Sequence, residues 1–141
     1  MSADRDDVEV RAVLDTSAVM SYARGHVHVG ELLIDIAAEG AYVGLPTVAL
    51  LEAYARVLGN EPSRARLGLL AVLPGVAQLE LGARDAAAVA LAVPLVDGDL
   101  ARAHAVWAAL EHSAYYLTTD PARAPSILTE DQIHAIPDVD G

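Results

Sequence analysis

The chain of 141 residues contains no cysteine. Without thiols there can be no disulfide framework, no thiolate zinc site, no iron–sulfur cluster and no cysteine nucleophile. Lysine is also missing, so all nine basic residues are arginines. This excludes P-loop nucleotide binding, whose motif ends in Gly-Lys-Ser/Thr, and Schiff-base chemistry, which needs an amine. No apolar run approaches the roughly 20 residues that cross a bilayer, so we expect no membrane span.

Positive charge is scarce as well. Nine arginines stand against 20 acidic residues, and the formal net charge is -11. So acidic a surface repels nucleic acid and leaves no room for a broad basic binding stripe. A polyanion would have to be bound locally or through metal ions. The first residues, MSADRDD, are acidic and lack the basic and apolar regions of a signal peptide, which predicts a cytoplasmic chain.

The length and a hydrophobic content of 54% predict one domain with a core of its own. We expect this domain to span residues 10–137. The acidic or turn-forming ends, residues 1–9 and 138–141, are expected to be flexible.

Short apolar runs alternate with amphipathic segments along the domain. Strands are predicted at 10–15, 42–45, 76–81 and 115–118, with 133–136 as a candidate fifth strand. Helices are predicted at 18–24, 29–39, 47–58, 62–73, 84–92 and 99–112, and a loop at 94–98. The alternation predicts an α/β fold, in which helices cover both faces of a parallel sheet of four or five strands. The segment 76–81 alternates in polarity and is expected near a sheet edge.

Helical periodicity predicts which helix faces are buried. The predicted faces are Leu32, Leu33 and Ile36 in 29–39; Leu51, Tyr54, Ala55 and Leu58 in 47–58; and Leu100, Ala103, Trp107 and Leu110 in 99–112.

Acidic residues stand near the ends of the predicted strands. Asp15 ends the first strand, Glu52 lies in the helix after the second, Asp97 and Asp99 begin the helix 99–112, and Asp120 follows the fourth strand. In an open parallel sheet, ligands bind beyond the carboxyl ends of the strands, so these acids converge on one pocket if the strands are neighbours.

Several carboxylates in one pocket repel each other unless they are protonated or a cation neutralises them. Mg²⁺ or Mn²⁺ would suit them, because these hard ions prefer oxygen ligands and also bind substrate phosphate. Such a site can hydrolyse phosphodiesters without lysine or cysteine.

Four segments resemble the four acidic motifs of PIN domains, in the family's order: LDTSA at 14–18, ALLEA at 49–53, DLARA at 99–103 and LTTDP at 117–121. The resemblance runs from Val10 to about Ile136 and is strongest for small single-domain bacterial PIN proteins of the VapC toxin type. It implies a three-layer α/β/α fold and a Mg²⁺- or Mn²⁺-dependent endoribonuclease that hydrolyses RNA phosphodiesters with a metal-activated water. It also implies a homodimer that a cognate antitoxin holds inactive. The acidic N-terminal extension and the acidic balance depart from the usual pattern.

The resemblance assigns four acids to metal binding and catalysis: Asp15, Glu52, Asp99 and Asp120, with Asp97 as the alternate to Asp99. Four hydroxyl residues would assist them, on substrate or on the acids: Thr16, Ser17, Thr118 and Thr119. Each acid also has a structural explanation. Asp15 and one of Asp97 and Asp99 would cap helices, Glu52 would pair with an arginine one turn on, and Asp120 would form a turn.

Two other functions stay open. One is a catalytically silent PIN-like module that acts through protein contacts, which the net charge favours. The other is an aspartyl-nucleophile phosphatase using Asp15, although such enzymes need a second aspartate two residues on, where this chain has Ser17. Four arginines are candidates for phosphate contacts or for ion pairs: Arg24, Arg56, Arg102 and Arg123.

Overall fold

The computed structural model describes residues 8–138. Five strands form one sheet in the order β3-β2-β1-β4-β5, and every neighbouring pair is parallel. The strands are β1 (Val10–Leu14), β2 (Tyr42–Pro46), β3 (Val76–Leu79), β4 (Tyr115–Thr118) and β5 (Ile133–Ala135). The predicted parallel α/β sheet is confirmed, with five strands, and β3 lies at its edge as expected.

The helices follow the predicted segments closely. They are α2 (Thr16–Ala23), α3 (His28–Ala38), α4 (Thr47–Arg56), α5 (Glu61–Val72), α6 (Ala83–Ala92) and α7 (Leu100–Glu111). Three short 3-10 turns are η1 (Val93–Val96), η2 (Pro121–Arg123) and η3 (Glu130–Gln132). The prediction of a loop at 94–98 was therefore partly wrong, because its first half continues α6 as η1.

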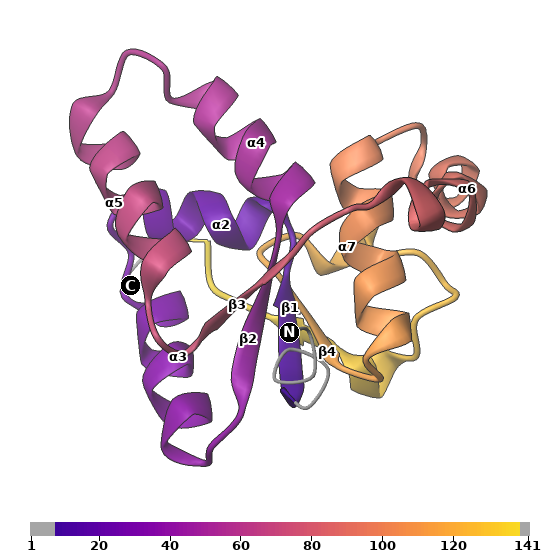
Figure 1. Ribbon diagram of the computed structural model, residues 1–141, viewed down its shortest axis with the longest axis horizontal. Coiled ribbons are helices and arrows are strands. Elements are labelled where there is room, and N and C mark those ends of the chain that lie inside the picture. Colours follow the sequence, from indigo (N-terminus) through magenta and orange to yellow (C-terminus); the bar gives the residue numbers. More distant parts are fainter. Residues whose placement is uncertain (1–7, 139–141) are drawn as a thin grey trace.

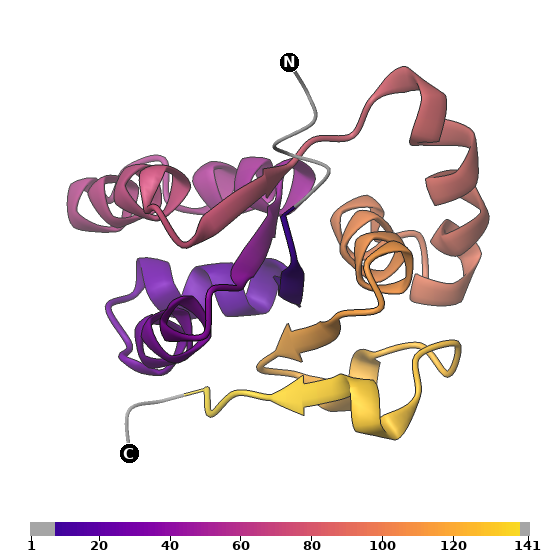
Figure 2. The ribbon, with the colours of Figure 1, turned by 60° about the horizontal axis from the view of Figure 1, so that its bottom comes forward.

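The sheet separates two apolar cores (Figures 1 and 2). Helices α2, α3, α4 and α5 pack on one face, around Leu14, Leu45 and Leu117 of the sheet. Helices α6 and α7 cover the other face, around Val13 and Tyr116. The layering is helix, sheet, helix, as the alternation of elements predicts.

The buried face predicted for 29–39 is confirmed, since Leu33 is buried and Leu32 and Ile36 pack partly against the core. The face predicted for 47–58 was wrong for three of its four residues, since only Tyr54 packs partly against the core and Ala55 is exposed. Leu51 and Leu58 are 68% and 71% exposed. The buried positions are instead occupied by small residues: Ala49, Ala53 and Val57.

The face predicted for 99–112 was wrong for its large residues, although Ala103 is buried as predicted. Leu100 is 66% exposed, Leu110 is also exposed, and Trp107 packs only partly against the core. The buried side of α7 carries alanines together with His104 and Val106. Small side chains let this helix lie close to the sheet and to α6 at once, so the larger residues point outward.

The amino-terminal end of the described chain, which was expected to be flexible, is held by contacts. Val8 packs against the core on the α6–α7 side, and the carbonyl oxygen of Glu9 accepts a hydrogen bond from the Tyr42 nitrogen at 2.8 Å. The remaining residues of the two ends that were expected to be flexible, apart from Asp138, are 1–7 and 139–141, and they lie outside the described residues. Within 8–138, no helix combines the length and the apolarity that crossing a membrane requires.

His104 on α7 is a buried polar residue. Its side chain is 0% exposed, and neither ring nitrogen finds a hydrogen-bond partner in the part of the chain that the structure describes. The ring stacks on Trp107, with centroids 6.4 Å apart. Burial lowers the pKa of His104, which Asp85 opposes only in part. The imidazole is therefore held neutral in the folded protein.

This histidine should make folding sensitive to mild acid. The unfolded chain takes up a proton at His104 as the pH falls below about 6.5, whereas the folded protein resists it, so stability falls with pH by at most about 1.4 kcal/mol per unit. We expect H104L and H104Q, which cannot titrate, to lose less stability than wild type between pH 7.5 and 5.5 in urea unfolding. Parallel pH profiles for wild type and both variants would contradict this account.

Candidate functional site

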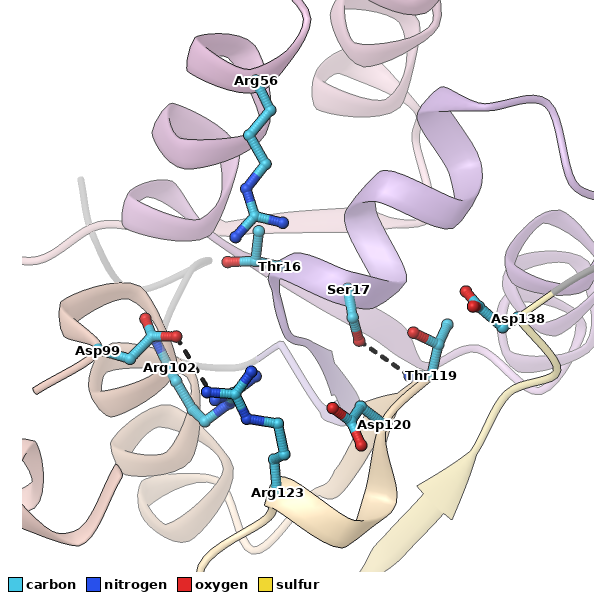
Figure 3. A pocket seen from close by; sticks show the side chains of 9 residues that line it. All are labelled: Thr16, Ser17, Arg56, Asp99, Arg102, Thr119, Asp120, Arg123 and Asp138. Carbon is cyan, nitrogen blue, oxygen red and sulfur yellow. Dashed lines mark hydrogen bonds and ion pairs between the residues drawn. The ribbon is translucent and has the colours of Figure 1, made fainter. Parts of the chain in front are cut away.

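A cleft of about 410 Å³ opens at the carboxyl end of the sheet. Its lining residues come from α2, α4, α7 and the segments after β4 and β5 (Figure 3): Thr16, Ser17, Arg56, Asp99, Arg102, Thr119, Asp120, Arg123 and Asp138. This is the position at which a parallel sheet binds its ligands. Two of the predicted acids, Asp99 and Asp120, line it directly.

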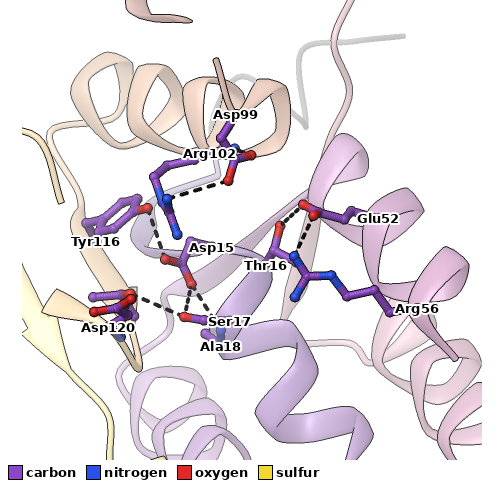
Figure 4. A network of polar contacts seen from close by, with 11 residues as sticks. Asp15, Thr16, Ser17, Ala18, Glu52, Arg56, Asp99, Arg102, Tyr116 and Asp120 are labelled. Carbon is purple, nitrogen blue, oxygen red and sulfur yellow. Dashed lines mark hydrogen bonds and ion pairs between the residues drawn. The ribbon is translucent and has the colours of Figure 1, made fainter. Parts of the chain in front are cut away.

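Asp15 lies behind the wall of this cleft. It follows the last residue of β1, and its backbone nitrogen donates to the Leu117 carbonyl at 3.1 Å, which ties the ends of β1 and β4 together. Its side chain is 1% exposed. The carboxylate accepts hydrogen bonds from the Ser17 hydroxyl at 2.6 Å and the Ala18 nitrogen at 3.0 Å on Oδ1, and from the Tyr116 hydroxyl at 3.0 Å on Oδ2 (Figure 4). The predicted helix cap is therefore present.

Two neighbours of Asp15, Tyr116 and Arg102, both stay protonated. Burial raises the pKa of Tyr116, and the carboxylate of Asp15 raises it further, so the phenol stays protonated and donates to Asp15. For Arg102, burial lowers the pKa, but Tyr116, Asp99 and Asp15 outweigh this, and the net pKa is raised. A protonated phenol and a permanent cation thus face a buried carboxylate.

Asp99 begins α7. Its Oδ1 accepts a hydrogen bond from the Arg102 nitrogen at 3.0 Å, and its Oδ2 lies 3.5 Å from Nη1 of the same arginine. Asp97, the alternate acid of this motif, is exposed at the end of η1 with a left-handed φ of 57° and is not among the lining residues. The structure therefore brings Asp99 to the cleft, and Asp99 also caps the helix.

Glu52 on α4 stands beside the cleft. Its Oε1 accepts a hydrogen bond from the Thr16 hydroxyl at 2.9 Å, and its Oε2 pairs with Nη2 of Arg56 at 2.6 Å. The ion pair expected with an arginine one turn on is present. Glu52 lines a second, shallower groove between α4 and α7, which it shares with Asp99.

Hydroxyl groups shape the backbone before Asp120. The Ser17 oxygen lies 3.2 Å from that of Thr118 and accepts a hydrogen bond from the Thr119 nitrogen at 2.9 Å. Thr118 in turn accepts from the Asp120 nitrogen at 3.0 Å. The loop after β4 is thus fastened to the start of α2, which holds Asp120 at the cleft.

The four predicted acids gather in one region but do not touch. Within residues 8–138, no three histidine, aspartate or glutamate side chains come close enough together to hold a metal ion. Figure 4 shows Arg56 against Glu52 and Arg102 against Asp99. Arginine side chains balance the charge of these carboxylates.

Two contributors were missed in the sequence. Asp138 follows β5 and lines the cleft, so the rule that finds acids after parallel strands would have found it too. No sequence pattern identifies Tyr116, because a tyrosine inside an apolar strand is expected to be a core residue. Only its pairing with Asp15, distant in the sequence, reveals it.

The sequence was compared with models of known protein families and with curated proteins, and neither comparison gives a match. The likeness to PIN domains thus has only the four motifs as its basis.

The bond from Tyr116 to Asp15 should contribute measurably to stability. We expect Y116F to lower the free energy of unfolding by about 1.5–3 kcal/mol, the range for a hydrogen bond to a charged group, because it leaves a buried carboxylate one donor short. Tyr115 is the matched control, since it is half exposed and makes no side-chain hydrogen bond among the described residues. Urea unfolding at pH 7 should therefore show Y115F close to wild type. An equal loss in both variants would contradict the assignment.

Proposed function

We propose that this protein is a Mg²⁺- or Mn²⁺-dependent endoribonuclease of the PIN type. One observation carries the proposal. Acidic side chains from four places far apart in the chain gather around one cleft at the carboxyl edge of a parallel sheet, with Asp99 and Asp120 in its lining and Asp15 behind it. A site rich in carboxylates, without thiols or lysine, suits cation-assisted hydrolysis of a phosphodiester.

The donor set suits a hard cation. Carboxylate oxygens are the preferred ligands of Mg²⁺ and Mn²⁺, and four acids would hold the ion: Asp15, Glu52, Asp99 and Asp120. Among its described contacts, Oδ2 of Asp15 accepts a single hydrogen bond, from Tyr116, and so keeps acceptor capacity. When bound, the cation would supply positive charge to the phosphodiester and make an attacking water more acidic.

The protein's own residues prepare this site. Tyr116, Ser17 and the Ala18 nitrogen hold the Asp15 carboxylate in one orientation. Arg102 and Arg56 offset the repulsion between the acids while no cation is bound. For a cation to reach Asp99 and Glu52, these guanidinium groups would have to turn away, toward the cleft that the substrate phosphate would enter.

The proposal includes the partners that the resemblance implies: an RNA substrate, a cognate antitoxin and a second copy in a homodimer, all in the cytoplasm. Exposed leucines support a protein partner. Leu51 on α4 and Leu100 on α7 are both solvent-exposed and line the groove beside Glu52. Neighbouring exposed apolar side chains next to a functional site mark surfaces that other proteins cover.

A catalytically silent module is the second candidate. The ion pairs of Glu52 with Arg56 and of Asp99 with Arg102 neutralise these acids without any metal, as a purely structural cluster would. The phosphatase alternative has less support. Asp15 is buried and both its oxygens accept hydrogen bonds, which leaves it poorly placed to attack phosphorus.

Divalent cations separate the two candidates. A cation that binds only the folded state should raise the melting temperature, by roughly 5–10 °C at a concentration 100-fold above its dissociation constant. We expect millimolar MnCl₂ to stabilise wild type and to support cleavage of a mixed RNA pool. D15N and D120N should lose both effects, with D120N serving as the less buried variant if D15N unfolds.

The matched control is D97N, because Asp97 lies outside the cleft and asparagine tolerates its left-handed backbone. D97N should keep the stabilisation and the cleavage of wild type. Absence of both effects in wild type would reject the nuclease and favour the silent module. Loss of both in D97N would reject the choice of Asp99 for the third motif.

A further inference from the structure

The arginines of this chain fall into two groups. Five of those in the described part form hydrogen bonds or ion pairs through their side chains: Arg11, Arg56, Arg64, Arg66 and Arg102. The other three have no such partner within residues 8–138: Arg24, Arg84 and Arg123. In a chain with 20 acidic residues, an arginine without a carboxylate partner is the less expected case, and Arg123 is the one of the three that lines the cleft.

Arg123 ends η2, directly after the loop that carries Asp120. Figure 3 shows its side chain reaching into the cleft from the side opposite Arg56, with Arg102 reaching in from α7. Three guanidinium groups from three elements thus line one cleft in a protein of net charge -11. Arg56 and Arg102 are bound to Glu52 and Asp99, whereas the side chain of Arg123 makes no hydrogen bond or ion pair within residues 8–138.

The remaining lining supplies neutral donors. The hydroxyl of Thr119 borders the cleft and makes no hydrogen bond within the described part of the chain, where only its backbone nitrogen is engaged. An unpaired guanidinium and a free hydroxyl on one wall are the donors that a phosphate needs, because a guanidinium forms two parallel hydrogen bonds to phosphate oxygens.

We propose that Arg123 is a substrate-binding residue that contacts a backbone phosphate of RNA in the cleft, assisted by Thr119. This inference rests on the proposed function, from which it takes RNA as the ligand. The inference specifies where the RNA backbone enters the cleft, which is along the wall formed by η2, opposite α4. It also gives a polyanion a local point of attachment on an acidic protein, since Arg123 lines the cleft and its side chain makes no hydrogen bond or ion pair within residues 8–138.

The test compares R123Q with R84Q, which removes an exposed and equally unpaired arginine on α6. Cleavage of a fluorescent single-stranded RNA is measured with Mn²⁺ between 20 and 200 mM NaCl, the usual range for salt titrations. We expect R123Q to raise KM about tenfold or more while kcat changes little. The slope of log(kcat/KM) against log[NaCl] should become shallower by about 0.7, the value of one lost phosphate contact.

Two further variants complete the comparison. R123K, which keeps the charge but not the planar fork, should restore the salt slope and only part of the KM. R84Q should match wild type, and the melting temperatures of all variants should agree. An unchanged KM and slope in R123Q, or an equal loss in R84Q, overturns the inference and leaves the nuclease standing.

If wild type does not cleave RNA, the role of Arg123 is tested by measuring RNA binding in the same buffer by fluorescence anisotropy. Weaker RNA binding by R123Q than by wild type supports the role of Arg123 while the nuclease fails. Equal binding by both, or no binding by either, overturns the inference as well.

Discussion

The buried carboxylate of Asp15 is the constraint on which the carboxyl end of the sheet and its cleft depend. It joins three elements, because its donors come from the first turn of α2 and from β4, while its own backbone continues β1. A carboxylate that is buried away from water is stable only when its oxygens accept hydrogen bonds. The positions of Ser17 and Tyr116 follow from that need, and through Ser17 the loop of Asp120 is held as well.

Charge balance explains the rest of the cleft. Acids at neighbouring strand ends repel each other, and the arginines on α4 and α7 reduce this repulsion through the pairs with Glu52 and Asp99. The cleft thus contains both carboxylate and guanidinium groups, and of its three arginines only Arg123 has no carboxylate partner within residues 8–138.

The sequence was sufficient for the fold and for the gathering of acids at the carboxyl end of the sheet, because the alternation of strand and helix patterns and the acids after the strands are local signals. It was not sufficient for packing. Leucine periodicity pointed to Leu51 and Leu100 as buried, whereas both are exposed and alanines face the core. Contacts such as that of Tyr116 with Asp15 join residues far apart in the chain, and no local pattern encodes them.

The alanines on the buried side of α7 have a consequence for the cleft. They allow the helix to pack close to the sheet. The amino end of the helix carries both Asp99, its N-cap, and Arg102. The spacing between helix and sheet therefore sets how near these two side chains come to Asp15. Because Ala103 is fully buried, we expect a bulkier residue there to push the amino end of α7 away from the sheet. An alanine in the core thus influences where the side chain of Arg102 lies at the cleft.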